Sequence, residues 1–267
     1  MMKSVIALVL FLLVQILCNA VAMLISNSEN LFSGGSIDVS KLQQSPEIMG
    51  ISLFFSSLIT IFLLFATKVA RRPRISKGLC KLQASTLIPL LAMLLLAFGE
   101  VFLINSFGLS DNGMTEMFKN MSGNFVCLLT LCIVGPITEE LVFREGVLRN
   151  FPSWRSGRLL AVVVSALAFA VVHGNPVQSV AAFASGMFFG ILFVATGNIR
   201  LSSAAHILNN TLAVVSFHVP SIGEDLEKVP NIVAIPLGLL LCSMSFVLIY
   251  FWWNSRTRCR LLPMFKK

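Results

Sequence analysis

The sequence contains few charged residues. Only 12% of its 267 residues are Asp, Glu, Lys or Arg, whereas 56% are hydrophobic, and the mean hydropathy is +0.86. Soluble globular domains carry about 25% charged residues, so this composition excludes an ordinary soluble fold. Apolar runs of about 20 residues, the length of a helix that crosses a bilayer, recur along the chain. The sequence therefore predicts a polytopic, all-α membrane protein.

Paired cysteines and several protease signatures are also missing. The six cysteines form no C-x-x-C pair, and most lie in apolar runs, which excludes a disulfide framework and a cysteine-type zinc site. No H-E-x-x-H is present, nor G-x-G-D, nor a rhomboid-like G-x-S-G. The basic residues form no nucleic-acid-binding motif, so we expect no nucleic-acid partner.

The hydrophobic runs predict a helix bundle of about eight transmembrane spans, in one integral-membrane domain that fills residues 1–267. The predicted spans are Ser4–Ile25, Ile48–Thr67, Ser85–Leu109, Phe125–Phe143, Leu159–His173, Val177–Thr196, Ser203–Val219 and Ile232–Trp253. The first span also resembles a secretory signal peptide, with Lys3 before an apolar core and small residues after it. Its cleavage stays open, and the other seven spans keep their orientation either way.

The distribution of charge predicts the topology. With the N-terminus inside, the 20 Lys and Arg residues all fall in inside segments except Lys41, Lys119 and Lys228. The outside loops hold most of the acids: Glu29, Asp38, Glu47, Asp111, Glu116, Glu224, Asp225 and Glu227. Because cytoplasmic loops are enriched in basic residues, we expect both termini in the cytoplasm. The basic loops and short length favour a bacterial host, and hence the lipid bilayer of the inner membrane.

The remaining acids are Glu100, Glu139, Glu140 and Glu145. Ionisable groups at membrane depth are costly and usually mark functional sites. Glu140 and Arg144 are four residues apart, so they share a helix face and can pair. A helix-end salt bridge would explain these two residues equally well.

Glu139 differs from its neighbour because it lies about 100° further round the helix, where Arg144 cannot serve both acids equally. A carboxylate in low dielectric beside a second carboxylate suits a general base that works near neutral pH. Pro136, one turn earlier, is expected to kink or break the helix just before the acids. Glu139 is therefore the candidate base.

Two later spans each bring a histidine. His173 ends the stretch F-A-V-V-H-G, four residues after Phe169, and His206 opens A-A-H-I-L-N-N-T, one turn before Asn210. Alone, His173 is explained by capping and the His206–Asn210 pair by an interhelical hydrogen bond. The second pair can also present two donors to one oxyanion. The predicted spans place the two histidines at opposite depths, and a shared site requires the fourth span to continue to about Asn150.

The ordered motifs E-E-x-x-x-R, F-x-x-x-H and H-x-x-x-N resemble those of the CPBP family, which includes the type II CAAX prenyl proteases and bacterial bacteriocin-processing and abortive-infection relatives. The motif-bearing protease core would cover residues 125–217. The resemblance implies an intramembrane endopeptidase that acts on a peptide or protein substrate at the membrane. It assigns water activation to Glu139, support to Glu140 and Arg144, water binding to His173, and oxyanion stabilisation to His206 and Asn210.

The resemblance leaves the cofactor open. The family is often described as metalloproteases, and Glu139, His173 and His206 could ligate zinc. A metal-free mechanism, in which the glutamate alone activates water, fits the same residues equally well. No cofactor is therefore assigned from the sequence.

Two other functions remain as alternatives. A non-catalytic immunity or scaffold protein could share the fold, although a scaffold has no need for unpaired intramembrane acids. A proton-coupled transporter would also contain buried acids such as Glu100 and a broken helix. A transporter would predict an internal repeat, which the sequence lacks.

Overall fold

The computed structural model describes residues 1–38, 40–71, 84–152, 157–219, 221–222 and 224–261, and every regular element among them is a helix. The long helices are α1 (Met2–Ser26), α4 (Pro46–Ala66), α5 (Ala84–Ser106), α9 (Arg158–Val172), α10 (Pro176–Thr196), α11 (Ile199–Ser216) and α13 (Asn231–Leu261). The short ones are α2 (Ser28–Phe32), α3 (Ser40–Gln43), α6 (Met114–Met121) and α12 (Glu224–Glu227). The predicted all-α, polytopic bundle is confirmed.

One further helical stretch, Phe125–Leu148, changes its winding along its length. It consists of α7 (Phe125–Leu129), the π-helix η1 (Thr130–Val134), α8 (Gly135–Glu140) and the π-helix η2 (Leu141–Leu148). The predicted fourth span, which ended at Phe143, is therefore too short by more than one turn. Helical structure through these apolar segments is expected, because a lipid environment offers the backbone no other hydrogen-bond partners.

Six of the described helical stretches are long and apolar enough to cross a membrane: Met2–Ser26, Pro46–Ala66, Thr86–Ser106, Phe125–Leu148, Pro176–Thr196 and Asn231–Ser255. The predicted spans at 159–173 and 203–219 coincide with helices α9 and α11, but these two fall outside that set. The helix α9 has only 15 residues. Length and composition thus support six of the eight predicted crossings, and the protein is an integral, multi-pass membrane protein.

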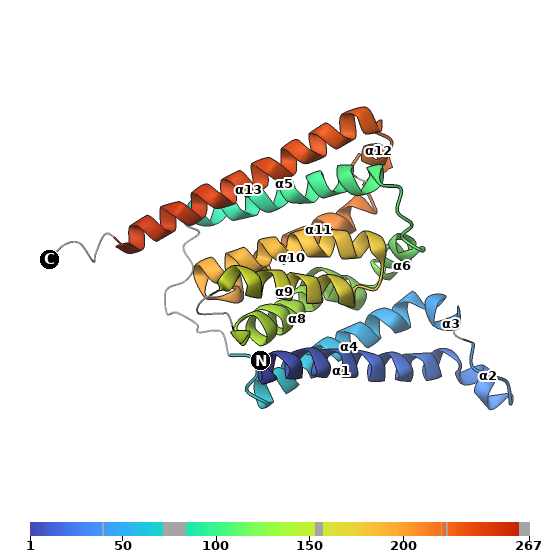
Figure 1. Ribbon diagram of the computed structural model, residues 1–267. Coiled ribbons are helices and arrows are strands. Elements are labelled where there is room, and N and C mark those ends of the chain that lie inside the picture. The colour runs from blue at the N-terminus through green and yellow to red at the C-terminus, as the bar shows by residue number, and fades with distance from the viewer. Residues whose placement is uncertain (39, 72–83, 153–156, 220, 223, 262–267) are drawn as a thin grey trace.

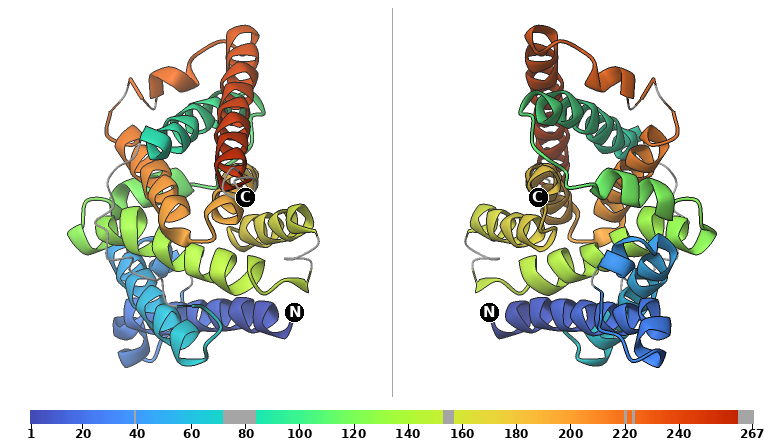
Figure 2. Two further views of the ribbon diagram at one scale, coloured as in Figure 1. Left: turned by 90° about the vertical axis from the view of Figure 1, so that its left-hand side faces the viewer. Right: turned by 90° about the vertical axis from the view of Figure 1, so that its right-hand side faces the viewer.

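The helices form three layers (Figures 1 and 2). The pair α1–α4 forms one outer layer and the pair α5–α13 the other, and between them lie α9, α10, α11 and the stretch from α7 to η2. One buried cluster joins the central layer to α1 and α4, around Phe11, Phe143 and Phe169. A second joins it to α5 and α13, around Phe189 and Trp252. The central layer is thus packed on both sides, and it carries all three sequence motifs.

Small residues permit the closest helix contacts. At the crossing of α5 and α13, Gly99 and Gly238 face each other, and a Cβ added to either residue would lie 3.0 Å from the backbone oxygen of the other. Such close approach of helix backbones through small residues is the main source of helix association in membranes. These glycines therefore fix the geometry of one outer layer.

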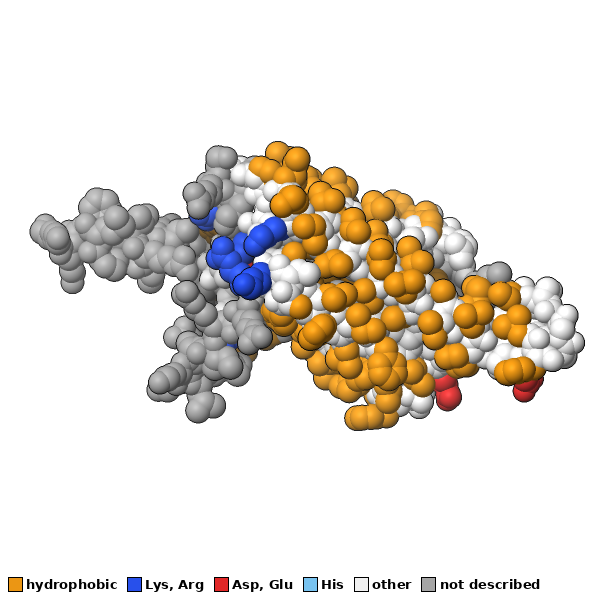
Figure 3. Space-filling model, turned by 90° about the horizontal axis from the view of Figure 1, so that it is seen from below, with side chains coloured by type: hydrophobic (Ala, Val, Ile, Leu, Met, Phe, Trp, Pro, Cys, Tyr) orange, Lys and Arg blue, Asp and Glu red, His pale blue; other side chains and the backbone are white. Residues whose placement is uncertain are grey.

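The two ends of the bundle differ in charge. The start of α1 and the end of α13 lie at the same end (Figure 1), and Lys and Arg side chains gather there on the face shown in Figure 3, whereas acidic side chains lie toward the opposite end. This separation agrees with the predicted sorting of charge. Which end faces the cytoplasm stays a prediction. The predicted inside residues Arg72, Arg74, Lys77, Lys81, Arg155, Lys266 and Lys267, and the side chains of Arg256, Arg258 and Arg260, lie outside the described part of the chain.

The described cysteines Cys18, Cys127, Cys132 and Cys242 are free. This agrees with the expectation that no disulfide framework is present. Cys80 and the side chain of Cys259 lie outside the described residues.

Candidate active site

The two adjacent acids lie in a continuous helical stretch, so the predicted break at Pro136 is wrong. The helix instead widens into a π-helix just before the proline. The N–H of Gly135 bonds to the carbonyl of Thr130, five residues back, and a Cβ at position 135 would come within 2.9 Å of that oxygen. Glycine therefore allows this wide turn. Short π-helical segments inside helices are frequent at functional sites.

The wide turn leaves one backbone carbonyl, that of Leu131, without its usual donors. The N–H of Gly135, four residues on, is bonded to Thr130, and Pro136, five residues on, has no N–H. Asn210 of α11 supplies the missing donor, with its side-chain amide 3.1 Å from the Leu131 oxygen. The asparagine of the third motif thus holds α11 against the segment that precedes the acids.

Glu140 and Arg144 form the predicted ion pair, and both side chains are fully buried. The Arg144 Nη2 lies 3.4 Å from Glu140 Oε1, and Nη1 donates to the hydroxyl of Ser165 at 3.3 Å. The guanidinium also lies over two aromatic rings, 5.2 Å from the centroid of Phe169 and 5.7 Å from that of Phe189. A charge this deep requires such partners, and the aromatic faces supply part of them.

His206 connects the two acids. Its Nδ1 lies 3.2 Å from Glu140 Oε1 and its Nε2 lies 3.4 Å from Glu139 Oε2. The ring is 3% exposed and stacks on Phe189 at a centroid distance of 4.5 Å. Glu139, by contrast, is 26% exposed. Although the two acids point to different sides of the helix, both reach one imidazole, and only Glu139 is open to a reactant.

The two histidines, which the predicted span ends placed at opposite depths, lie on the same phenylalanine. The ring of Phe169 is 4.7 Å from the ring of His173 and 5.6 Å from that of His206, with edge-to-face geometry in both cases. The His173 Nδ1 is 2.7 Å from the carbonyl of Phe169. If this nitrogen donates the bond, Nε2 remains as an acceptor. The extension of the fourth span to Leu148 and the start of α11 at Ile199 remove the predicted mismatch in depth.

The structure thus brings all six predicted site residues, Glu139, Glu140, Arg144, His173, His206 and Asn210, into one region of the central layer. It connects five of them to one another through direct contacts or the shared ring of Phe169. Asn210 is joined through the backbone of Leu131 instead. Glu100 lies apart in α5, 9% exposed, and its Oε1 has no hydrogen-bond partner among the described residues.

The sequence analysis missed Ser165 and Phe189. Ser165 is 1% exposed, accepts from Arg144 and donates to the carbonyl of Phe143 at 2.8 Å. A lone serine inside the apolar run A-V-V-V-S-A-L-A-F was a signal for it. Phe189 lies among several phenylalanines of α10, and nothing in the sequence marks it as the one that stacks on His206.

The predicted zinc ligands do not form a three-ligand set. Among the described residues, no group of three or more His, Cys, Asp or Glu side chains is placed to hold a metal ion. The imidazole of His206 directs both nitrogens at carboxylates, which leaves neither free for a metal. The zinc site stays a prediction, and no step of the proposed reaction is assigned to a metal.

These features define a class of protein: a multi-pass helical membrane protein with a buried Glu–His–Arg cluster that is open on one side at a single carboxylate. Residues 121–212 match the family described as type II CAAX prenyl endopeptidase Rce1-like. A stretch of 88 residues is 28% identical to the Bacillus subtilis (strain 168) protein named "Putative membrane peptidase YdiL". These matches confirm the predicted resemblance to the CPBP family.

The similarity to the curated relative is partial. The aligned stretch covers 33% of this chain and 36% of the relative, so it spans about a third of each protein. No solved structure matches this chain. The similarity therefore concerns the part of the chain that carries the motifs.

Proposed function

We propose that this protein is an intramembrane endopeptidase that hydrolyses peptide bonds with a glutamate-activated water. The observation that carries the proposal is the contact between the partly exposed Glu139 and the buried His206, whose other nitrogen faces Glu140. The family match and the peptidase name of the bacterial relative support a hydrolase of this type. The substrate is a peptide or protein that reaches the site within the membrane.

The charges of the cluster favour a fixed geometry. With a proton on each ring nitrogen, His206 donates to both Glu139 and Glu140. Two carboxylates then face the imidazolium and Arg144, so the four groups carry no net charge. A buried cluster without net charge avoids most of the cost of transferring isolated ions out of water. Glu140 and Arg144 act as positioning residues, because they orient the imidazole and contact no space that a substrate can enter.

In the proposed reaction, Glu139 takes a proton from a water molecule as the oxygen of that water attacks the peptide carbonyl carbon. The C–N bond of the resulting tetrahedral intermediate then breaks, and the proton passes from Glu139 to the leaving amine. One water molecule is consumed, and a carboxylic acid and an amine are released. His206 lies beside Glu139 and stabilises the oxyanion by hydrogen bonding, as preorganised donors do in other acyl-transfer sites.

His173 and Asn210 have secondary roles in this proposal. His173 would hold the water through Nε2, since its Nδ1 faces the Phe169 carbonyl. Asn210 uses one amide proton on Leu131, and the second proton remains to support the oxyanion.

The test compares variants of two acids in the same helical stretch. Glu139→Gln removes the base, whereas Glu145→Gln changes a buried acid that is paired with Arg149 at 2.7 Å, outside the cluster. New N-termini in the membrane proteome of cells that express each form report the cleavage. We expect the products of the wild-type protein to fall at least about 100-fold with Glu139→Gln and to persist with Glu145→Gln.

Purified variants are first checked by thermal unfolding in detergent, so that only folded proteins are compared. Undiminished cleavage by folded Glu139→Gln would contradict the proposal. If the wild-type products are absent but a phenotype of the gene persists in Glu139→Gln, a non-catalytic immunity or scaffold role is favoured instead.

We further propose that both termini face the cytoplasm of a bacterial inner membrane. The grouping of basic side chains at the end of the bundle where α1 starts supports this orientation. Reporter domains that are active only in the cytoplasm, fused in turn to each terminus, test it. Activity from neither fusion contradicts the orientation.

A further inference from the structure

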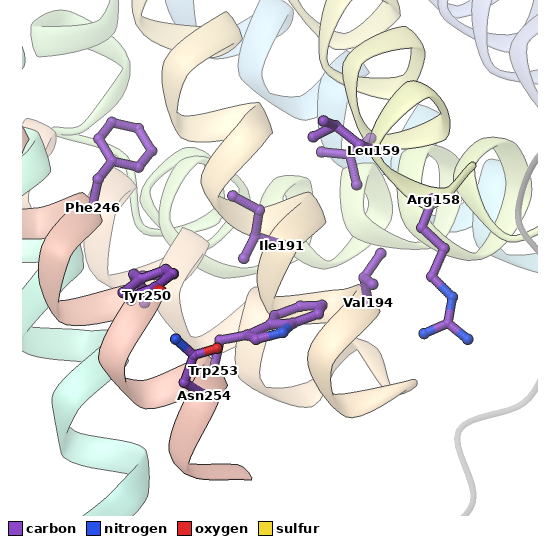
Figure 4. A pocket seen from close by; sticks show the side chains of 10 residues that line it. Arg158, Leu159, Ile191, Val194, Phe246, Tyr250, Trp253 and Asn254 are labelled. Atoms are coloured by element: carbon purple, nitrogen blue, oxygen red, sulfur yellow. The ribbon is translucent and has the colours of Figure 1, made fainter. Parts of the chain in front are cut away.

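A lateral groove lies between α9, α10 and α13, with a volume of about 410 Å³ (Figure 4). Its floor includes the buried residues Val162 and Ile249, which are 2% and 3% exposed. Its rim includes Leu159 and Phe246, which are 68% and 42% exposed. The groove is open to the side of the bundle, where lipid surrounds a membrane protein, and none of its lining residues belongs to the Glu–His–Arg cluster.

The polar residues of the groove lie toward one end. In Figure 4 the apolar Phe246 and Leu159 lie toward one end, and the Arg158 guanidinium, Trp253 and Asn254 lie toward the other. The polar end belongs to the first residue of α9 and the last turns of α13, so it lies at the basic end of the bundle. The groove therefore offers a long apolar wall that ends in a cation and an indole.

A second groove shows that this pattern is not a general property of the bundle surface. It lies between α1 and α4, has a volume of about 520 Å³, and is lined by apolar residues together with Cys18 and Ser52. No charged residue lines it. The larger groove could thus hold a hydrocarbon chain of any lipid, whereas the groove at α9 adds a group that distinguishes between headgroups.

We propose that the groove at α9, α10 and α13 binds an anionic glycerophospholipid, with an acyl chain along the apolar wall and the phosphate at Arg158. The guanidinium matches a phosphate with paired hydrogen bonds. Trp and Tyr prefer the headgroup level of a bilayer, and Trp253 and Tyr250 line this groove. Gly157, at the N-cap of α9, makes no side-chain cap, so the first N–H groups of the helix add a partial positive charge at the same end.

The site is independent of the proposed peptidase reaction, and lipid binding is measured without a substrate. Purified protein is incubated with equal amounts of phosphatidylglycerol and phosphatidylcholine that carry the same acyl chains. Native mass spectrometry then counts the lipids that remain bound. We expect the wild-type protein to retain phosphatidylglycerol in preference, and Arg158→Gln to reduce that preference about fivefold.

Two tryptophan variants separate the grooves. Leu159→Trp fills the proposed site from its exposed rim and is expected to lower retention of phosphatidylglycerol. Ile51→Trp fills the groove between α1 and α4 and is expected to leave this retention unchanged. An undiminished preference in Arg158→Gln, or equal losses in Leu159→Trp and Ile51→Trp, would overturn the proposal. Thermal unfolding in detergent confirms that each variant is folded.

Discussion

Asn210 donates its side-chain amide to the backbone carbonyl of Leu131 at 3.1 Å, and this bond joins the third sequence motif to the π-helix before the first. The carbonyl needs this donor because Gly135 is bonded to Thr130 and Pro136 has no N–H. The proline that precedes the acids and the asparagine of α11 are therefore parts of one arrangement. Each compensates for a feature that would be costly without the other.

The bond predicts the effect of removing the amide. Asn210→Ala leaves the Leu131 carbonyl without a donor, so we expect the free energy of unfolding to fall by about 1 kcal/mol. Reversible unfolding in mixed micelles measures the change. Asn209→Ala, which removes the same group from the adjacent position, is the matched control and is expected to have a smaller effect. Equal losses in the two variants would show that the bond does not stabilise the fold.

The buried ion pair predicts a non-additive effect of two substitutions. Arg144→Met leaves Glu140 buried without its cation, so we expect a loss of about 3–5 kcal/mol in the free energy of unfolding. The double variant Glu140→Gln with Arg144→Met removes both charges and is expected to be more stable than Arg144→Met alone. The same micelle assay measures both proteins. Additive losses in the double variant would mean that the pair is not coupled.

The fold class and the site followed from different kinds of signal. Long apolar runs predicted the helices, because a chain in lipid must satisfy its backbone internally. The site emerged from the few polar residues in those runs, such as Glu139 and His206, because each is costly in that environment. Both signals are properties of single residues or short spacings, which a sequence displays directly.

The parts that sequence could not provide depend on contacts between distant segments. The bridging of both acids by His206 requires the rotation of α11 relative to α8, which no spacing determines. The π-helical winding at Gly135 depends on how Asn210 is placed 75 residues later in the chain. The wrong break at Pro136 came from a rule for α-helices, and a wider turn removes the clash that the rule assumes.

The closest helix crossing predicts a sharp steric effect. A Cβ at Gly99 would lie 2.6 Å from the sulfur of Cys242 and 3.0 Å from the backbone oxygen of Gly238. Because backbone atoms cannot move aside, Gly99→Ala is expected to separate α5 from α13 and lower the free energy of unfolding by about 1–3 kcal/mol. In Gly123→Ala the new Cβ would meet only Asn120 O, at 3.4 Å, so this control is expected to be nearly neutral. A neutral Gly99→Ala would contradict the tight crossing.

A loop near the candidate site predicts a dependence of stability on pH. Hydrogen bonds from Thr115, and then from Gly113, lower the pKa of Asp111. The backbone carbonyl of the same residue accepts from Asn175 at 2.6 Å, two residues after His173. Since the folded pKa lies below the unfolded one, the carboxylate stabilises the fold above the unfolded pKa of about 4, and this contribution is lost as pH falls through the folded pKa.

Asp111→Asn therefore tests the role of that carboxylate in the loop. We expect the variant to be less stable than the wild-type protein near neutral pH, and the difference to shrink as the pH falls below about 4. Thermal unfolding in detergent across this range measures it. Asp225→Asn, in the acid paired with Lys228 at an exposed position, is the control and is expected to show little change because exposed ion pairs contribute little. A stability difference for Asp111→Asn that is constant across the whole range would mean that the charge of Asp111 plays no part, since only the charged form accepts these bonds at full strength.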